Sequence, residues 1–134
     1  MPGYSGTPLI QKLGWRAGGR VYLLTPPAEY REWLGPSAQG IEFTSRVPAA
    51  PEAAHLFVTE RRVLAASLER LRGRLVPTGV IWVSWPKKTA KVPTDITEDT
   101  IRDVALPLGY VDVKVCAVSD VWSGLKLMIR KGER

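Results

Sequence analysis

The residues best suited to chemistry follow an apolar segment from Gly79 to Lys88, which reads GVIWVSWPKK. Trp85 would stack on a planar ligand, and the ammonium groups of Lys87 and Lys88 would meet a phosphate or carboxylate. Asp95 follows in the next loop, where it would cap a helix or contact the ligand. This part of the chain therefore predicts a pocket for a small anionic or aromatic ligand.

Hydroxyl side chains stand at or near the ends of three expected strands. Because ligands bind outside the carboxyl ends of strands in open α/β sheets, these hydroxyls would line the same crevice. The predicted ligand-binding residues are therefore Thr25, Thr59, Ser84, Trp85, Lys87, Lys88 and Asp95. The sequence predicts no catalytic residue and no metal ligand.

A standard cofactor site is not expected. Dinucleotide sites place glycines after the first strand so that backbone N–H groups approach the ligand, but here the strand is followed by Thr25-Pro26-Pro27. Proline has no N–H to donate. The second strand ends at Thr44-Ser45-Arg46, without the carboxylate that would hold a ribose. The sequence identifies no cofactor.

Hydrolytic chemistry has few candidate residues. The single histidine, His55, begins an apolar segment, where a structural hydrogen bond is the commoner role. Cys116 is interpreted as a small buried hydrophobe, because no basic partner is identifiable nearby. Nothing in the spacing brings His55 to Ser84 or Ser123 beside an oriented carboxylate, and a zinc site has no ligand set.

Alternating strands and helices would position these side chains. The expected strands cover residues 20–25, 41–46, 55–59, 80–85, 111–118 and 125–130. The expected helices cover 8–13 and 28–34, an amphipathic segment with Leu64, Leu68, Leu71 and Leu75 on one face, and a segment from about Asp95 to Pro107. This order predicts one α/β domain over residues 1–134, with a doubly wound, mostly parallel sheet and a C-terminal antiparallel hairpin.

From the amphipathic helix onward, the pattern resembles the C-terminal half of S-adenosylmethionine-dependent methyltransferases. Those domains have a helix, a Pro-Gly-type turn (here Pro77-Thr78-Gly79), a parallel strand, a helix and a final antiparallel hairpin, which here would turn at Val121 to Lys126. The resemblance implies a truncated, Rossmann-like methyltransferase fold. A likeness of fold implies little about activity.

Along its whole length, the chain resembles a small uncharacterised bacterial family of unknown function. The motifs that carry this resemblance are YSGTPL at Tyr4 to Leu9, WVSWPKK at Trp82 to Lys88, PTD at Pro93 to Asp95, and VWSGLK at Val121 to Lys126. This resemblance supports the fold and implies no activity.

Composition limits the classes of partner. The chain has 134 residues, a formal charge of +6 and one cysteine, with a sequence pI near 9.8. The positive charge is spread along the chain, so nucleic acid is a possible partner but not a favoured one. A single cysteine fits a reducing compartment, and no signal peptide is visible, so we expect a cytoplasmic protein. No apolar run reaches the roughly 20 residues that span a bilayer, so no membrane partner is expected.

The sequence leaves three functions open, as well as the oligomeric state. The leading hypothesis is a non-catalytic small-ligand-binding or regulatory module on a degenerate methyltransferase-like fold. The second is an enzyme with a non-standard cofactor site, which requires a buried Lys87 or Lys88. The third is an interaction module, which would bind nucleic acid through its basic surface or a protein through exposed tryptophans such as Trp122.

Overall fold

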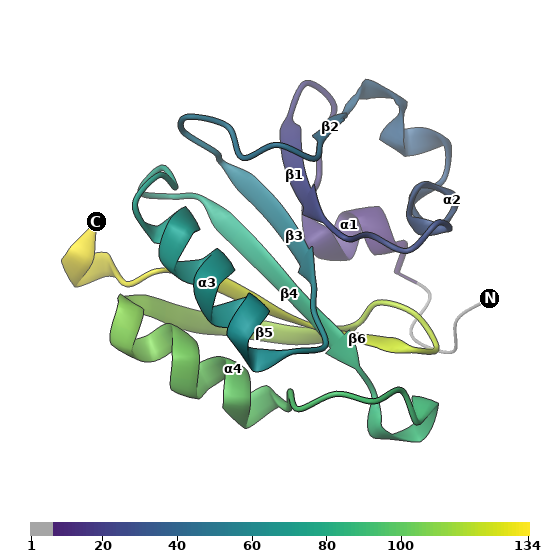
Figure 1. The fold of residues 1–134 in the computed structure, drawn as a ribbon. Helices are drawn as coiled ribbons and strands as arrows, with labels where there is room; N and C mark the ends of the chain where they lie inside the picture. The colour runs from purple at the N-terminus through teal and green to yellow at the C-terminus, as the bar shows by residue number, and fades with distance from the viewer. Residues whose placement is uncertain (1–6) are drawn as a thin grey trace.

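The computed structural model describes residues 7–134, which form a six-stranded mixed sheet with helices on both faces (Figure 1). Tyr4 to Gly6 of the YSGTPL motif lie outside the described residues. The strand order is β2-β1-β3-β4-β6-β5, with β1 to β4 parallel and the last two strands antiparallel to their neighbours. The expected α/β, doubly wound, mostly parallel sheet with a C-terminal hairpin is confirmed.

The observed elements follow the predicted order. The strands are β1 (Arg20–Leu24), β2 (Glu42–Thr44), β3 (Ala53–Phe57), β4 (Val80–Pro86), β5 (Tyr110–Ala117) and β6 (Trp122–Ile129). The α-helices are α1 (Leu9–Leu13), α2 (Tyr30–Leu34), α3 (Arg61–Arg72) and α4 (Glu98–Ala105). Short 3-10 helices cover Pro36–Gly40, Lys88–Ala90, Leu106–Leu108 and Lys131–Glu133.

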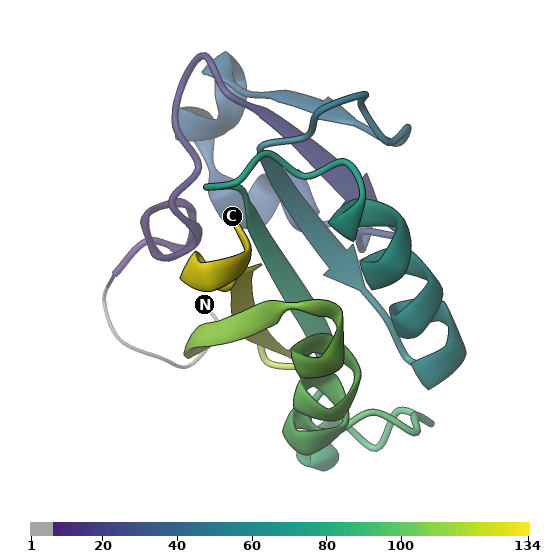
Figure 2. The ribbon, with the colours of Figure 1, turned by 90° about the vertical axis from the view of Figure 1, so that its left-hand side faces the viewer.

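Strand alternation sends the side chains of β4 into two separate cores. Ile81, Val83 and Trp85 pack in the core beneath α3 and α4, whereas Trp82 packs with residues of α1 on the opposite face. Figures 1 and 2 show α3 and α4 on one side of the sheet and α1 on the other. The leucines predicted on one face of α3 are buried in the first core, because a helix repeat of 3.6 residues aligns them. The sheet is therefore covered on both faces, so a ligand site is expected at its edges.

The last strand of the C-terminal hairpin, β6, begins earlier in the chain than the sequence indicated. We expected a connection over 119–124, but β6 already starts at Trp122, where it pairs with Pro86 of β4. Ser119 tightens the turn, because its hydroxyl accepts hydrogen bonds from the N–H groups of Val121 and Trp122. In the sheet, β6 lies between β4 and β5, and β5 is an outer strand.

Within residues 7–134, no helix is long and apolar enough to cross a membrane.

Candidate functional site

The sheet reverses its strand order at β1, which lies between β2 and β3. Open α/β sheets bind ligands at such a switch point, outside the carboxyl ends of the strands. Thr25 follows β1 with a φ of 45°, and its hydroxyl donates a 2.6 Å hydrogen bond to the carbonyl oxygen of Phe57. This bond joins the two strand ends between which a ligand would enter.

Aromatic side chains fill the α2 side of the same switch point. The ring of Phe57 lies 5.1 Å from Trp122 and 6.4 Å from Trp33, measured between centroids. Tyr30 packs edge-on against Phe57 at 5.5 Å. The crevice predicted at β1 and β3 is therefore occupied by the protein's own side chains on this face.

A buried hydrogen-bonded network lies beneath these aromatic rings. Trp15 Nε1–H donates to the Tyr30 hydroxyl at 3.0 Å, and that hydroxyl lies 2.9 Å from His55 Nδ1. His55 Nε2 lies 2.8 Å from Ser84 Oγ. If Tyr30 donates to Nδ1, then Nε2 carries the proton and donates to Ser84, and every hydrogen from Trp15 to His55 has an acceptor. We assign that tautomer.

Burial controls the ionisation of this network. His55 and Ser84 are both fully buried, and desolvation lowers the pKa of His55 to about 3. Desolvation also raises the pKa of the Tyr30 phenol, against the opposing effect of the hydrogen bond from Trp15. The network is therefore neutral at physiological pH.

The meeting of His55 with Ser84 was not foreseen from the sequence. The two residues come together because Phe57 is in register with Ser84 across β3 and β4, and His55 lies two residues earlier on the same face. A serine within hydrogen-bond reach of a histidine is part of the arrangement of nucleophilic hydrolases, whose histidine is oriented by a carboxylate. Here Tyr30 is in the orienting position. The Ser84 hydroxyl faces the buried core and does not line a crevice, contrary to its predicted position.

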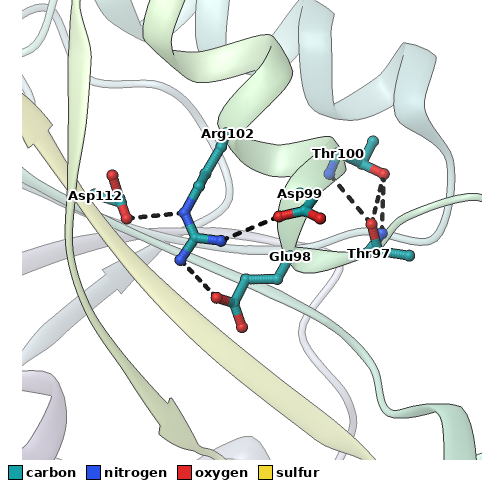
Figure 3. A network of polar contacts seen from close by, with 6 residues as sticks. All are labelled: Thr97, Glu98, Asp99, Thr100, Arg102 and Asp112. Atoms are coloured by element: carbon teal, nitrogen blue, oxygen red, sulfur yellow. Dashed lines mark hydrogen bonds and ion pairs between the residues drawn. The ribbon is translucent and has the colours of Figure 1, made fainter.

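Asp95 caps a different helix from the one we expected. Its Oδ1 accepts a 2.6 Å hydrogen bond from the backbone N–H of Arg61, at the start of α3. Helix α4 begins at Glu98, too far along the chain for Asp95 to cap it, and Thr97 with Thr100 forms its capping box (Figure 3). The prediction that Asp95 caps its own helix was therefore wrong.

The Asp95 loop is also attached to the end of β3. The carbonyl oxygen of Thr59 accepts hydrogen bonds from the Thr94 hydroxyl at 2.7 Å and from the Asp95 N–H at 3.2 Å. The backbone groups of Thr59 and Asp95 therefore meet, whereas the predicted role of their side chains in ligand binding stays a prediction. Their polar groups bind one another across the sheet edge.

An open cleft of about 670 Å³ lies beyond the carboxyl end of β4. Trp85, Lys87 and Lys88 line it, as the sequence predicted. Pro86, between them in the chain, also lines it. The residues that sequence reasoning did not identify are Val92, Thr94, Ile96, Thr97, Glu98 and Asp99. Their signal was the long connection before α4, because a loop that leaves a strand end and returns along it encloses space.

Charge at this cleft, which we call the β4 cleft, is unevenly balanced. Lys87 is half-exposed and Lys88 is exposed, and within residues 7–134 neither forms an ion pair. The acidic residues at the rim, Glu98 and Asp99, are both bound by Arg102. The cleft therefore presents two ammonium groups whose charge no carboxylate offsets.

Arg102 joins α4 to the outer strand β5 (Figure 3). Its Nε donates to Asp112 at 2.9 Å, while its other nitrogens bind Glu98 and Asp99. The hydrogen bond from Arg102 lowers the pKa of the Asp112 carboxyl, and the two carboxylates at Asp112 and Glu98 raise the pKa of Arg102. Arg102 therefore favours the charged form of Asp112 and pairs with all three carboxylates.

Within residues 7–134, few side chains could support a metal site, a reactive thiol or a ribose-binding carboxylate. No group of three histidine, cysteine or acidic residues there could hold a metal ion. Cys116 is half-buried, and burial raises the pKa of its thiol. Glu42, the acidic residue of β2, stands at the start of that strand, where it pairs with Arg20 at 3.0 Å. It is therefore at the opposite edge from a ribose-binding position.

Comparison with known proteins identifies the fold. The crystal structure of a protein from Sulfolobus solfataricus, assigned as a type 11 methyltransferase, matches with a TM-score of 0.64 and 12% identity, over 94% of this chain and 92% of that one. The N-methyltransferase NodS from Bradyrhizobium japonicum matches with a TM-score of 0.61 and 7% identity, over 92% and 93%. An O-methyltransferase of neocarzinostatin biosynthesis, solved with S-adenosylmethionine, matches with a TM-score of 0.57 and 14% identity, over 84% and 49%.

No protein-family model and no curated protein sequence matches this chain. The structural similarity establishes a methyltransferase-like, Rossmann-like fold, and at these identities it establishes the fold alone.

Proposed function

We propose that this protein is a binding module that holds a small anionic ligand in the β4 cleft without converting it. The observation that carries the proposal is the pair of lysines, Lys87 and Lys88, which line the cleft without ion-pair partners within residues 7–134. A volume of about 670 Å³ lies in the range of small-molecule pockets.

The composition of the cleft indicates the form of the ligand. Lys87 and Lys88 would bind a phosphate or carboxylate through charge-assisted hydrogen bonds. Val92 supplies exposed apolar surface, and the largely buried Trp85 and Ile96 form part of the wall. A ligand with an anionic end and a planar or apolar body fits these surroundings.

Catalysis has weaker support than binding. The second hypothesis requires a buried lysine, whereas Lys87 is half-exposed and Lys88 is exposed. The acid–base pair His55 and Ser84 is fully buried away from the β4 cleft. Binding therefore accounts for the exposed groups, and the histidine network accounts for stability.

Ligand titrations of the full chain test this proposal. S-adenosylmethionine is one probe, because a structural neighbour was solved with it, and ADP and coenzyme A are anionic probes with planar bodies. We expect at least one to raise Tm and to bind measurably in calorimetry at low salt. The double variant Lys87→Gln, Lys88→Gln should weaken that binding by about tenfold or more, because two charge-assisted contacts are lost.

Lys91→Gln is the matched control. Lys91 belongs to the same loop but does not line the cleft, and the substitution removes one positive charge. The affinity of the Lys91→Gln variant for the probe should stay within about twofold of the wild type. Equal affinity of the wild type and the double variant for the probe would refute the β4 cleft as the site. Conversion of the bound probe to a product, detected by chromatography, would refute a non-catalytic role.

A further inference from the structure

A β-bulge in the outer strand determines which face Lys114 occupies. Asp112 is in register with Leu127 of β6, but Lys114 is in register with Lys126, so Val113 is the extra residue. Without the bulge, Lys114 would lie opposite Leu125, on the face covered by α3 and α4. The bulge turns Lys114 to the α1 side and places it directly opposite a second lysine.

Like charges directly opposite each other on one face of a sheet are destabilising. Lys114 is exposed and Lys126 is half-buried, and within residues 7–134 neither forms an ion pair. The acidic residue nearest to Lys114 in sequence, Asp112, lies on the other face, where Arg102 binds it. Burial, together with the charge of Lys114, lowers the pKa of Lys126.

Protection of an outer strand explains only one of these lysines. A bulge and a charged side chain are common devices against edge-to-edge pairing, and both occur on β5. Lys126, however, belongs to β6, an inner strand with a partner on each side. An unfavourable charge there needs another explanation, and bulges that redirect a side chain are over-represented beside functional sites.

The surroundings of the lysine pair are also basic. Lys12 of α1 and Lys114 both act electrostatically on the thiol of Cys116, so they approach the same part of this face. Lys126 lines a cleft of about 470 Å³ together with Arg16 and Trp15. Among the described residues, Glu52 is the only carboxylate that lines this cleft, and Arg20, which also lines it, is bound to Glu42.

We propose that Lys114 and Lys126 form a binding site for the phosphate group of a small phosphorylated ligand, on the α1 side of the β5–β6 hairpin. A bound phosphate would sit between the two ammonium groups and convert their repulsion into shared attraction. The adjoining cleft at Trp15 and Arg16 would hold the rest of the ligand. This site is separate from the β4 cleft and does not depend on the proposed function.

Inorganic pyrophosphate is the first probe, used with the full chain at low ionic strength. We expect it to raise the Tm of the wild type. The double variant Lys114→Gln, Lys126→Gln should bind pyrophosphate at least about tenfold more weakly. Lys131→Gln, which removes one positive charge at an exposed C-terminal position, is the control and should keep wild-type affinity.

A second measurement separates a binding site from ordinary surface lysines. Without ligand, Lys114→Gln should raise Tm by about 1–3 °C, because it relieves a like-charge pair, whereas Lys131→Gln should leave Tm unchanged. A variant that is more stable alone but no longer responds to pyrophosphate is the expected result. An equal pyrophosphate response in the double variant and in Lys131→Gln would overturn the proposal.

Two further measurements identify the source of the phosphate and distinguish the Lys114–Lys126 site from the β4 cleft. Lys87→Gln with Lys88→Gln should leave the pyrophosphate response intact, and its loss there would overturn the assignment to the hairpin. Binding of single-stranded DNA without binding of pyrophosphate or ADP, with steep salt dependence, would overturn a small ligand in favour of nucleic acid.

Discussion

The ends of β3 and β4 are neighbours on the same edge of the sheet, yet they differ in how their polar groups are satisfied. At the end of β3, Thr59 binds the Asp95 loop, and Thr25 bonds across to Phe57. At the end of β4, Lys87 and Lys88 line an open cleft. A polar residue at a strand end therefore indicates a ligand site only where the protein itself leaves that residue without a partner.

Chain length after each strand produces this difference. Helix α3 starts at Arg61, soon after β3 ends at Phe57, so the side chains there close on one another. After β4 the chain runs through residues 87–97 before α4 begins. The longer connection can be held at Thr59 by one end and still leave space beside Trp85.

The largest expected effect is the loss of folding stability in acid, and it arises from His55 on β3. The pKa of His55 is lowered from 6.5 to about 3 in the folded protein, so stability is complete above pH 6.5 and is lost as pH falls toward 3. We expect the free energy of unfolding to fall by roughly 3 kcal/mol between about pH 7 and about pH 4 from this group. Urea titrations at several pH values measure it.

His55→Gln provides the reference for that titration. It lacks a titratable group, so its stability should be lower at neutral pH but should not show the loss across this window. Equal acid sensitivity in the variant and the wild type would show that other groups, and not His55, cause the loss.

Removing the Tyr30 hydroxyl should have the next largest effect. Tyr30→Phe leaves both the Trp15 N–H and His55 Nδ1 buried without a partner, and we expect a loss of about 2–4 kcal/mol in unfolding free energy. Tyr110→Phe is the matched control, because it removes one bond, to the carbonyl of Leu68, and should cost about 1 kcal/mol. Equal losses would argue against a network on the β3 side.

Releasing the Asp95 loop should have a smaller effect that reaches both sides of the comparison. Asp95→Ala removes the cap of α3 and should lower the unfolding free energy by about 1 kcal/mol. It should also weaken binding in the β4 cleft, because the loop that encloses the cleft loses an attachment. Asp103→Asn, at an exposed position of α4, should change neither quantity, and no change in affinity with Asp95→Ala would show that the loop holds its position without this bond.

The smallest expected effect comes from the rim of the β4 cleft. Arg102→Gln should cost only about 0.5 kcal/mol, because its ion pairs are partly exposed. It should weaken the binding of an anion a few-fold at low salt, since Glu98 and Asp99 would no longer be offset. Arg70→Gln on α3 is the control for a lost positive charge, and equal affinities in the two variants would contradict the role of Arg102 at the rim.

Local patterns were sufficient to predict the helices and strands but not the contacts between them. The leucine repeat of α3 and the apolar run of β4 are set by nearby residues, so they were visible in the sequence. The meeting of His55 with Ser84 depends on the order and register of two strands, which no local pattern encodes. The position of Trp85, Lys87 and Lys88 at one strand end followed from the sequence, and these residues line the β4 cleft, but their role in ligand binding stays a prediction.

Two features of the chain are misleading when read locally. Asp95 lies just before a helix, but its carboxylate caps another helix that is distant in sequence. The segment around Val113 alternates like a regular strand, so the bulge that redirects Lys114 could not be seen. The first feature depends on a contact with a residue distant in sequence, and the second depends on the register of β5 against β6.

The position of β6 has a consequence for how the molecule folds. It follows β5 in the chain but lies between β4 and β5 in the sheet, so the sheet cannot form by adding strands in chain order. The β5–β6 hairpin is a local structure, whereas the pairing of β4 with β6 closes a longer loop. We therefore expect the hairpin to form early and to dock as a unit onto β4, the step that places Ser123 opposite Trp85.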